Sequence, residues 1–285
     1  MTDDSVIPAL PKSEADQPGV RFPFGKNWQR FLQYLDEERI AEAERSLCDM
    51  VGVDRMAGKS VLDIGSGSGL FSLAAMRLGA KTVHSFDFDA QSVACTRELK
   101  RRYFDEAPNW TIERGSVLDR DYLSRLGQFD LVYSWGVLHH TGNMWQALES
   151  VAPLTAPAGK LFIAIYNDQD VYSRGWGIVK RIYNRGFLGR LPVIAVFGSY
   201  FVLRGLAKDL VTLRNPLNRY RQFKRSRGMA YSTDLLDWLG GYPFEVAKPE
   251  AIIDFLRPKG FALEKLKTAG IGHGNNEFVF VKPVK

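Results

Sequence analysis

Val61–Leu70, with the sequence VLDIGSGSGL, is the stretch that decides the fold of this chain. Its first four residues have the character of a buried strand, and glycines then occupy alternate positions. The residues that follow, among them Leu73, Ala74 and Leu78, have the apolar spacing of a helix. The pattern predicts a strand, a tight turn and the start of a helix. Because glycine has no Cβ, a ligand can approach the turn closely, and the N–H groups at the helix start face that ligand.

The glycine spacing also indicates which ligand the turn holds. A dinucleotide fingerprint needs G-x-G-x-x-G, whereas here Gly69 comes one residue early and Leu70 follows it. Asp87 ends a second strand-like run, and a carboxylate about twenty residues past the turn is where an α/β nucleotide fold holds ribose hydroxyls. Alternatively, Asp87 caps the helix expected to begin near Ala90, although Asp89 is the better candidate for that cap.

Three more strand-like runs follow, over residues 110–114, 129–134 and 159–166, and helical patterns separate them. The last run is continuously apolar, as expected of a central parallel strand. A closing antiparallel pair is expected over 261–267 and 278–281. The alternation predicts a doubly wound, Rossmann-like α/β fold, in which a mostly parallel seven-stranded sheet has helices on both faces and a helical insertion follows strand five.

Polar and aromatic residues fall where the predicted strands end, at Asp63, Asp87, Ser116, Trp135 and Tyr166. Ligands of parallel α/β sheets bind at the carboxyl ends of the strands. The five positions therefore predict one shared site.

The runs DIGSGSG, FDLVYS and VLHH, in this order between Val61 and Tyr166, resemble class I S-adenosylmethionine-dependent methyltransferases. Within that family they are most similar to the type 11/12 methyltransferases that include the ubiquinone-biosynthesis O-methylases. The resemblance implies S-adenosyl-L-methionine as cofactor and S-adenosyl-L-homocysteine as product. The cofactor-binding residues that it implies are Asp63, Gly65, Ser66, Gly67, Gly69, Leu70, Asp87, Phe88, Ser116, Val117, Leu118 and Trp135.

Within this set the family pattern implies distinct roles. The acid of the first strand, Asp63, lies near the methionine amino group, and the glycine turn wraps the methionine and ribose. Ser116, Val117 and Leu118 follow the third strand, where the family lines its adenine pocket. Asp119 either accepts a hydrogen bond from the adenine amino group or caps the next helix.

Two adjacent histidines, His139 and His140, follow the fourth strand. A histidine beside the site suits removal of a proton from a hydroxyl or ammonium acceptor near neutral pH. The resemblance favours His140 as the base, with His139 second. Alternatively, one or both brace the loop through hydrogen bonds to the backbone. The residues expected to contact the acceptor are Phe24, Trp28, Tyr166, Asn167, His273 and Asn276.

The composition and pattern divide the chain into five predicted segments. Residues 1–20 are a tail rich in Pro, Asp and Ser that we expect to be disordered. Residues 21–58 form a lid and a helix, and 59–170 form the cofactor-binding core. Residues 171–245 are a basic helical insertion that acts as a substrate lid, and 246–285 complete the sheet with a helix and two strands.

Several helices are expected at particular positions. One runs over 28–51, one over 144–151, and one over 249–256, where proline suits the first turn. In the insertion, helices are expected over 173–186 and 192–213. The aromatic turn before the first helix either folds over the cofactor as a lid or only fastens that helix to the core.

The insertion concentrates the positive charge of the chain. Residues 171–230 contain 13 Lys or Arg and one acid, Asp209, giving +12, whereas the whole chain carries +6. The apolar run 191–203 between Arg190 and Arg204 is expected to be too short to span a bilayer. We therefore weigh a lid or homodimer contact, a bilayer interface and, less favoured, a grip on RNA phosphates, because no stacking-aromatic pattern accompanies the charges.

The predicted function is methyl transfer to the oxygen or nitrogen of a small molecule. A membrane-associated, lipid-like acceptor and a non-catalytic binding partner of the same fold are the alternatives. The two cysteines, Cys48 and Cys95, predict a reduced, cytoplasmic protein, membrane-peripheral if the insertion binds lipid. No Cys/His cluster has zinc-ligand spacing, so no metal is expected, and nucleic acid is not expected as a partner.

Overall fold

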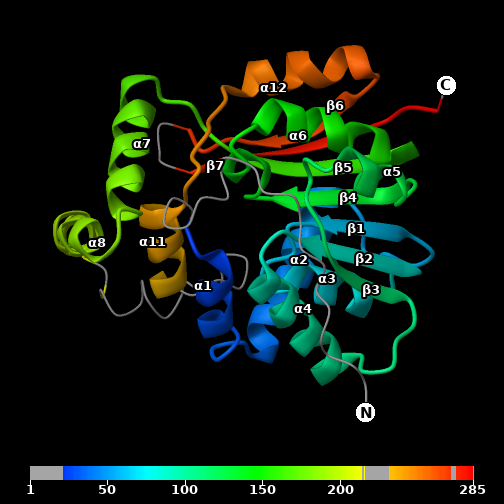
Figure 1. Ribbon diagram of the computed structural model, residues 1–285, viewed down its shortest axis with the longest axis horizontal. Helices are drawn as coiled ribbons and strands as arrows, with labels where there is room; N and C mark the ends of the chain where they lie inside the picture. The colour runs from blue at the N-terminus through cyan, green and yellow to red at the C-terminus, as the bar shows by residue number, and fades with distance from the viewer. Residues whose placement is uncertain (1–21, 214, 216–230, 271–273, 285) are drawn as a thin grey trace.

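One mixed sheet of seven strands organises the molecule, with strand order β3-β2-β1-β4-β5-β7-β6 (Figure 1). The computed structural model describes residues 22–213, 215, 231–270 and 274–284. The strands are β1 (Ser60–Ile64), β2 (Thr82–Asp87), β3 (Trp110–Arg114), β4 (Phe129–Trp135), β5 (Thr155–Tyr166), β6 (Ala262–Lys267) and β7 (Asn275–Val281). This confirms the predicted Rossmann-like α/β fold. The expected tail over residues 1–20 lies outside the described residues.

Helices connect the strands and extend the chain beyond them. They are α1 (Phe24–Phe31), α2 (Glu37–Val51), α3 (Leu70–Arg77), α4 (Ala90–Tyr103), α5 (Arg120–Ser124), α6 (Met144–Val151), α7 (Val171–Tyr183), α8 (Phe187–Val193), α9 (Ser199–Val211), α11 (Tyr231–Gly240) and α12 (Pro249–Leu256). Short 3₁₀ turns lie at η2 (Leu138–His140), η3 (Ala152–Leu154) and η6 (Arg257–Lys259), and a π-helical turn at η4 (Ile194–Gly198).

The strand pairing places a topological switch at the centre of the sheet. β1 pairs in parallel with β2 on one side and β4 on the other, while β3 and β5 extend the parallel part outward. β7 runs antiparallel to β5 and β6, as the closing pair predicted. The chain therefore reverses its winding direction between β1 and β4, which is where α/β sheets bind ligands.

Both faces of the sheet are covered, so its strands are apolar on both sides. Val61 of β1 packs with α2, α3 and α4 in one core cluster. Its neighbour Leu62 points to the other face, where it packs with α5, α6 and α12. Figure 1 shows these two sets of helices on opposite sides of the strands. β5 has the near-continuous apolar character that was predicted for it over residues 159–166.

Side-chain caps set the starts of three helices. Asp36, Asp89 and Asp119 accept hydrogen bonds from the backbone N–H groups of Arg39, Gln91 and Tyr122, respectively. The prediction that Asp89 caps α4 is confirmed, and Asp119 takes the capping role that was one of its two alternatives. Each such cap contributes about 1 kcal/mol to helix stability.

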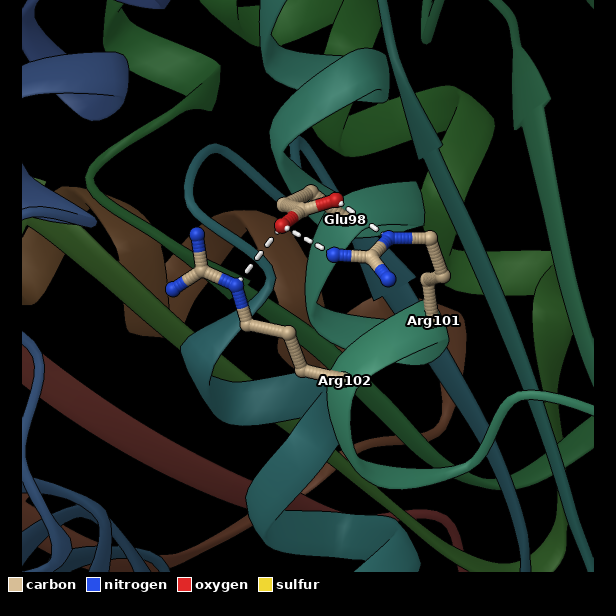
Figure 2. A network of polar contacts seen from close by, with 3 residues as sticks. All are labelled: Glu98, Arg101 and Arg102. Atoms are coloured by element: carbon tan, nitrogen blue, oxygen red, sulfur yellow. Dashed lines mark hydrogen bonds and ion pairs between the residues drawn. The ribbon is translucent and has the colours of Figure 1, made fainter.

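On the exposed side of α4, a small ion-pair network spans one helical turn. Figure 2 shows the Glu98 carboxylate accepting hydrogen bonds from the guanidinium groups of Arg101 and Arg102, at 2.8 Å and 2.7 Å. These bonds lower the pKa of Glu98 to about 2. The pairs have i,i+3 and i,i+4 spacing, so they support the helix locally, by a few tenths of a kcal/mol each.

The first predicted helix differs from the structure. The single helix expected over 28–51 is two helices, α1 and α2, because Asp36 starts a new helix with its own cap. By contrast, the helices predicted over 144–151 and 249–256 have those bounds. The five-segment division of the chain stays a prediction.

The insertion also differs from expectation in the length of its apolar helix. α8, η4 and α9 form one continuous helical stretch, Phe187–Val211, of 25 residues. The prediction that this apolar segment is too short to cross a bilayer is therefore wrong, by length and composition. The prediction counted only residues 191–203, but α8 continues through Pro192 and the π-helical turn then joins it to α9.

A matched pair of glycine substitutions tests the packing around the first turn. Gly69 and Gly79 both have left-handed φ angles, of 82° and 88°. A Cβ at Gly69 would lie 2.8 Å from the Thr96 Cα, whereas a Cβ at Gly79 would meet nothing within 4 Å. We expect Gly79→Ala to cost about 1 kcal/mol and Gly69→Ala about 1–3 kcal/mol more, measured by urea unfolding. An equal loss of unfolding free energy in both variants would contradict the packing of the start of α3 against α4.

Candidate functional site

A large cavity of about 2240 Å³ lies at the carboxyl ends of the parallel strands. Its walls come from the turn after β1, the end of β2, the loop after β3 and the ends of β4 and β5. Helices α1, α2, α3, α9 and α11 and strands β6 and β7 also contribute to the wall. The cavity thus occupies the switch point of the sheet, and it brings together segments that are distant in sequence.

The turn after β1 is fastened to the end of β2 by the Asp87 carboxylate. The backbone N–H of Gly67 donates to Asp87 Oδ2 at 2.9 Å, and the N–H of Asp89 donates to Oδ1 at 2.8 Å. Gly67 has a φ of 56°, and a Cβ there would lie 2.8 Å from Trp28 Nε1. Glycine at this position is therefore needed both for the turn and for the approach of Trp28.

Beyond Asp87 the cavity wall becomes partly apolar. Phe88, Val117 and Leu118 line it, and the guanidinium of Arg114 lies 5.8 Å from the centre of the Phe88 ring. The Ser116 hydroxyl accepts a hydrogen bond from the Leu118 N–H, at 3.2 Å, which shapes the loop. This part of the wall has the character expected of a surface for a flat heteroaromatic ring.

Helix α1 lies across the glycine turn and is held by two hydrogen bonds in its N-terminal half. The Gly25 N–H donates to Asp89 Oδ2 at 2.8 Å, and Asn27 Nδ2 donates to Asp237 Oδ1 at 2.9 Å. Phe24 and Trp28 line the cavity. Trp28 also packs against the core cluster under α2. The aromatic turn therefore lies in the cavity wall and is also attached to the core, and its role as a lid over the cofactor stays a prediction.

The two adjacent histidines have different environments. His140 lines the cavity, packs 4.9 Å from Phe24 between ring centres, and places Nδ1 2.5 Å from the Pro243 carbonyl oxygen. A carbonyl can only accept, so Nδ1 donates, and Nε2 of the neutral ring is then the acceptor nitrogen. His139 is fully buried and is not among the cavity-lining residues; its ring packs on Tyr166. Burial lowers the pKa of His139 well below its usual value, so it is a neutral core residue.

Asp63 is buried on the side of the sheet that faces α3. It is 3% exposed and is not among the residues that line the cavity. The Ser72 hydroxyl donates to Asp63 Oδ2 at 2.5 Å and lies 2.7 Å from the Ser85 hydroxyl, which accepts from Trp110 Nε1 at 2.9 Å. The carboxyl therefore belongs to a buried polar chain that joins β1, α3, β2 and β3. Burial raises the pKa of Asp63 to about 7.

The far side of the cavity is formed by β5 and by the insertion. Tyr166, Trp238 and Asp237 line it, together with Arg204 and Lys208 of α9. Asn167 and Asn276 are not among the cavity-lining residues. They bond to each other instead, and Asn276 Nδ2 donates to Asn167 Oδ1 at 2.9 Å. Their neighbours Gly274 and Asn275 reach the cavity instead. His273 lies outside the described residues.

Behind this wall lies a buried lysine. Lys180 of α7 is fully buried, and its Nζ lies 4.7 to 5.3 Å from the ring centres of Trp238, Phe244 and Tyr166. The Nζ donates to the Trp238 carbonyl oxygen. Burial lowers the pKa of Lys180 to about 7. The lysine thus connects α7 to α11 directly behind two cavity residues.

Most of the site residues predicted from the sequence line one cavity. Those in its wall are Gly65, Ser66, Gly67, Leu70, Asp87, Phe88, Ser116, Val117, Leu118, Trp135, His140, Phe24, Trp28 and Tyr166. Those outside the lining are Asp63, Gly69, His139, Asn167 and Asn276. The roles of all of these residues stay predictions.

The sequence predicted the insertion as a substrate lid but did not identify which of its residues line the cavity. Asp237, Trp238, Phe201, Arg204 and Lys208 have no motif around them. The only signal was the density of basic residues, which does not say which side chains face inward. Within the part of the chain that the structure describes, no group of three or more His, Cys, Asp or Glu could hold a metal ion.

The chemistry of the cavity wall fits an adenosyl cofactor. A carboxylate at the end of β2 suits ribose hydroxyls, and the apolar residues after β3 suit an adenine ring. The glycine turn leaves backbone at the cavity wall between these two surfaces. Asp63 does not reach the cavity, because its side chain points to Ser72, and its implied role near the methionine amino group stays a prediction.

Comparison with known proteins supports this assignment. Residues 62–161 match a family model described as "Methyltransferase domain". The chain is 51% identical over 51 residues to a ribosomal protein L11 methyltransferase of Alteromonas mediterranea, and 28% identical over 119 residues to the mitochondrial ubiquinone biosynthesis O-methyltransferase of Dictyostelium discoideum. Those matches cover 18% and 39% of this chain, and 17% and 36% of the two relatives. The chain thus matches well under half of the length of these relatives.

The fold is also similar to solved structures. One is the magnesium protoporphyrin IX methyltransferase of Synechocystis with bound SAH (S-adenosylhomocysteine), with a TM-score of 0.53 and 14% identity. The similarity covers 90% of this chain and 93% of that one. At this identity the likeness shows the fold alone. Together with the family match, it confirms the resemblance to class I methyltransferases.

The raised pKa of Asp63 predicts how stability depends on pH. A folded-state pKa of about 7 exceeds the unfolded value, so the folded protein holds an extra proton between about pH 4 and pH 7. The stabilisation that comes from the protonated Asp63 carboxyl is therefore present at low pH and is lost as the pH rises through about 7. At about 1.4 kcal/mol per pKa unit, the loss is bounded at about 4 kcal/mol.

Two aspartate variants test this dependence by urea unfolding across that pH range. Asp63→Asn keeps an acceptor for Ser72 and should flatten the decline of the unfolding free energy. Asp130→Asn is the matched control, because hydrogen bonds from Ser60 outweigh burial and hold the pKa of Asp130 below its usual value. Asp130→Asn should keep the wild-type slope above about pH 4. A decline that persists in Asp63→Asn would show that Asp63 does not cause it.

Proposed function

We propose that this protein, whose residues 62–161 form a class I S-adenosylmethionine-dependent methyltransferase domain, transfers a methyl group to the oxygen or nitrogen of a small molecule. The observation that carries the proposal is the Asp87 carboxylate bonded to the Gly67 N–H at the wall of the cavity. This contact joins the two parts of the chain that would hold the cofactor sugar.

The cavity has two regions, one for the cofactor and one for the acceptor. The cofactor, when bound, supplies a methyl group on a positively charged sulfur that is already activated for in-line displacement. The glycine turn, Asp87 and Phe88 would hold it, whereas Tyr166 and Trp238 lie toward the insertion, where the acceptor would bind. Aligning two reactants in this way can supply several kcal/mol of the barrier.

His140 is the residue that we assign to proton removal. Its Nδ1–H is bound to the Pro243 carbonyl, which fixes the ring and makes Nε2 the nitrogen that accepts a proton from the acceptor. The ring lines the cavity beside Phe24. His139 has no such access, since it is buried beneath Tyr166, and we assign it to bracing the loop.

A lipid-like acceptor is the second candidate, and one observation favours it. Helix α9 lines the cavity through Phe201, Arg204 and Lys208, while Leu203 and Leu206 on the same helix are exposed. An apolar acceptor could therefore reach the cavity along this helix. A non-catalytic role would differ from both candidates in giving no methylated product.

The test of the proposed function is a screen for acceptors with methyl-labelled S-adenosylmethionine. Purified protein is incubated with candidate acceptors, both polar and lipid-soluble, and release of S-adenosylhomocysteine is measured. Label in a product supports methyl transfer and identifies the acceptor class. Cofactor binding without label transfer to any acceptor would favour the non-catalytic alternative.

Replacing Asp87 should weaken cofactor binding. Asp87→Asn keeps one acceptor for the Gly67 N–H but loses the charge that holds the ribose hydroxyls. Hydrogen bonds to a charged group contribute about 1.5–3 kcal/mol, so S-adenosylhomocysteine affinity should fall by roughly 10–100-fold in calorimetry. Asp254→Asn, in an exposed acid of α12, should leave the affinity unchanged. Equal affinities for the two variants would remove Asp87 from the cofactor site.

Replacing His140 should affect turnover rather than binding. Loss of a general base lowers turnover by about 10²–10⁴-fold, so His140→Ala should do so with whichever acceptor the screen identifies. Its S-adenosylhomocysteine affinity should change little. His84→Ala is the control, because His84 lies in β2 and bonds Tyr122 away from the cavity lining. Wild-type turnover in His140→Ala would exclude His140 as the base.

A further inference from the structure

The insertion presents a long apolar surface that no described residue covers. We define the arm as residues 171–213, comprising α7, α8, η4 and α9. It contains the continuous helix Phe187–Val211. Only 6% of the most apolar 18-residue stretch of this helix is buried. Leu203 and Leu210 are 64% and 76% exposed. The exposed large apolar residues of this helix are Phe187, Leu188, Leu191, Val196, Tyr200, Leu203, Leu206, Leu210 and Val211.

The exposed residues recur at helical spacing and form one face. Leu188, Val196, Leu203 and Leu210 are seven or eight positions apart, that is, two helical turns. A continuous apolar face of this length on a soluble monomer marks an interaction site.

The opposite face of the same helix is anchored to the protein. Phe197 and Phe201 pack against Trp176 of α7, with ring centres 5.1 Å and 6.0 Å away. Arg204 and Lys208 line the cavity. The helix is therefore fixed along one side and exposed along the other. In Figure 1, α7 and α8 lie beside the sheet, outside α1 and α11.

The exposed charges of the arm are all positive. Within the arm the basic residues are Arg174, Lys180, Arg181, Arg185, Arg190, Arg204 and Lys208, and all except Lys180 are exposed. The single acid of the arm, Asp209, is only 4% exposed. An apolar face on an arm with exposed basic residues and no exposed acid is complementary to an anionic lipid surface.

We propose that the arm binds in the plane of an anionic lipid bilayer, with Phe187–Val211 as its interfacial helix. A second copy of the chain fits this surface less well, because a two-fold contact would bring the same basic residues face to face. A spanning orientation conflicts with the inner face of the helix, since Arg204 and Lys208 line the cavity and Phe201 packs on α7. In-plane binding would place the α9 side of the cavity at the lipid surface.

The test is sedimentation of the purified full-length chain with vesicles, without cofactor or acceptor. Vesicles of phosphatidylcholine alone are compared with vesicles that also contain phosphatidylglycerol. We expect binding to the anionic vesicles, weakened by salt, and extraction by alkaline carbonate. Because neither cofactor nor acceptor is present, the result is independent of whether the proposed methyl transfer is correct.

Matched variants locate the binding surface. Leu203→Glu with Leu210→Glu should reduce vesicle affinity at least tenfold by placing charge on the apolar face. Tyr34→Glu with Val284→Glu alters two exposed apolar positions elsewhere and should keep wild-type affinity. Arg174→Gln with Arg185→Gln should weaken binding about fivefold for each charge removed. Circular dichroism and calorimetry with S-adenosylhomocysteine check that each variant is folded.

Several results would overturn the proposal. Absence of sedimentation with anionic vesicles, or wild-type binding by the double variant Leu203→Glu with Leu210→Glu, would exclude this face as a lipid surface. Resistance to carbonate extraction would indicate a spanning helix. A dimer in light scattering that only the leucine variants dissociate, together with no vesicle binding, would assign the face to contact between copies.

Discussion

The hydrogen bond from the Gly67 N–H to the Asp87 carboxylate is the contact on which the site depends. It joins the turn after β1 to the end of β2, which are neighbours in the sheet but 20 residues apart in the chain. The second Asp87 oxygen accepts from Asp89, which in turn caps α4 and holds the start of α1 through Gly25. The Asp87 carboxylate thus fixes the glycine turn, and the Asp89 carboxylate fixes α1, the helix that covers this turn.

Beneath this surface, a second polar system orders the sheet without reaching the cavity. Asp63, Ser72, Ser85 and Trp110 form a buried chain across β1, α3, β2 and β3. Buried polar groups stabilise a unique arrangement when each has its partner. The acid of the glycine motif, Asp63, is therefore bonded within the core, whereas Asp87 is among the carboxylates that line the cavity.

The sequence predicted the parallel core well because its signals are local. A buried strand, a glycine turn and a capped helix each depend on neighbouring residues, and residues 110–114, 144–151 and 249–256 have the predicted bounds. The break between α1 and α2 was missed because the Asp36 cap lies inside an otherwise continuous helical pattern. Orientation was the harder problem: Asp63 and His139 were correctly placed near strand ends, but their side chains are buried. Asn276 was expected outside the closing strand pair, whereas it lies in β7 and its side chain bonds to Asn167. Asp237 and Trp238 could not be predicted, since only tertiary packing of the insertion brings them to the cavity.

A crystal structure of the protein soaked with S-adenosylhomocysteine would locate the cofactor directly. We expect the ribose hydroxyls within hydrogen-bonding distance of the Asp87 carboxylate, and the adenine ring against Phe88 and Val117. Density for the nucleoside at another place, or none in crystals whose cavity is open to solvent, would contradict the assignment of this cavity to the cofactor.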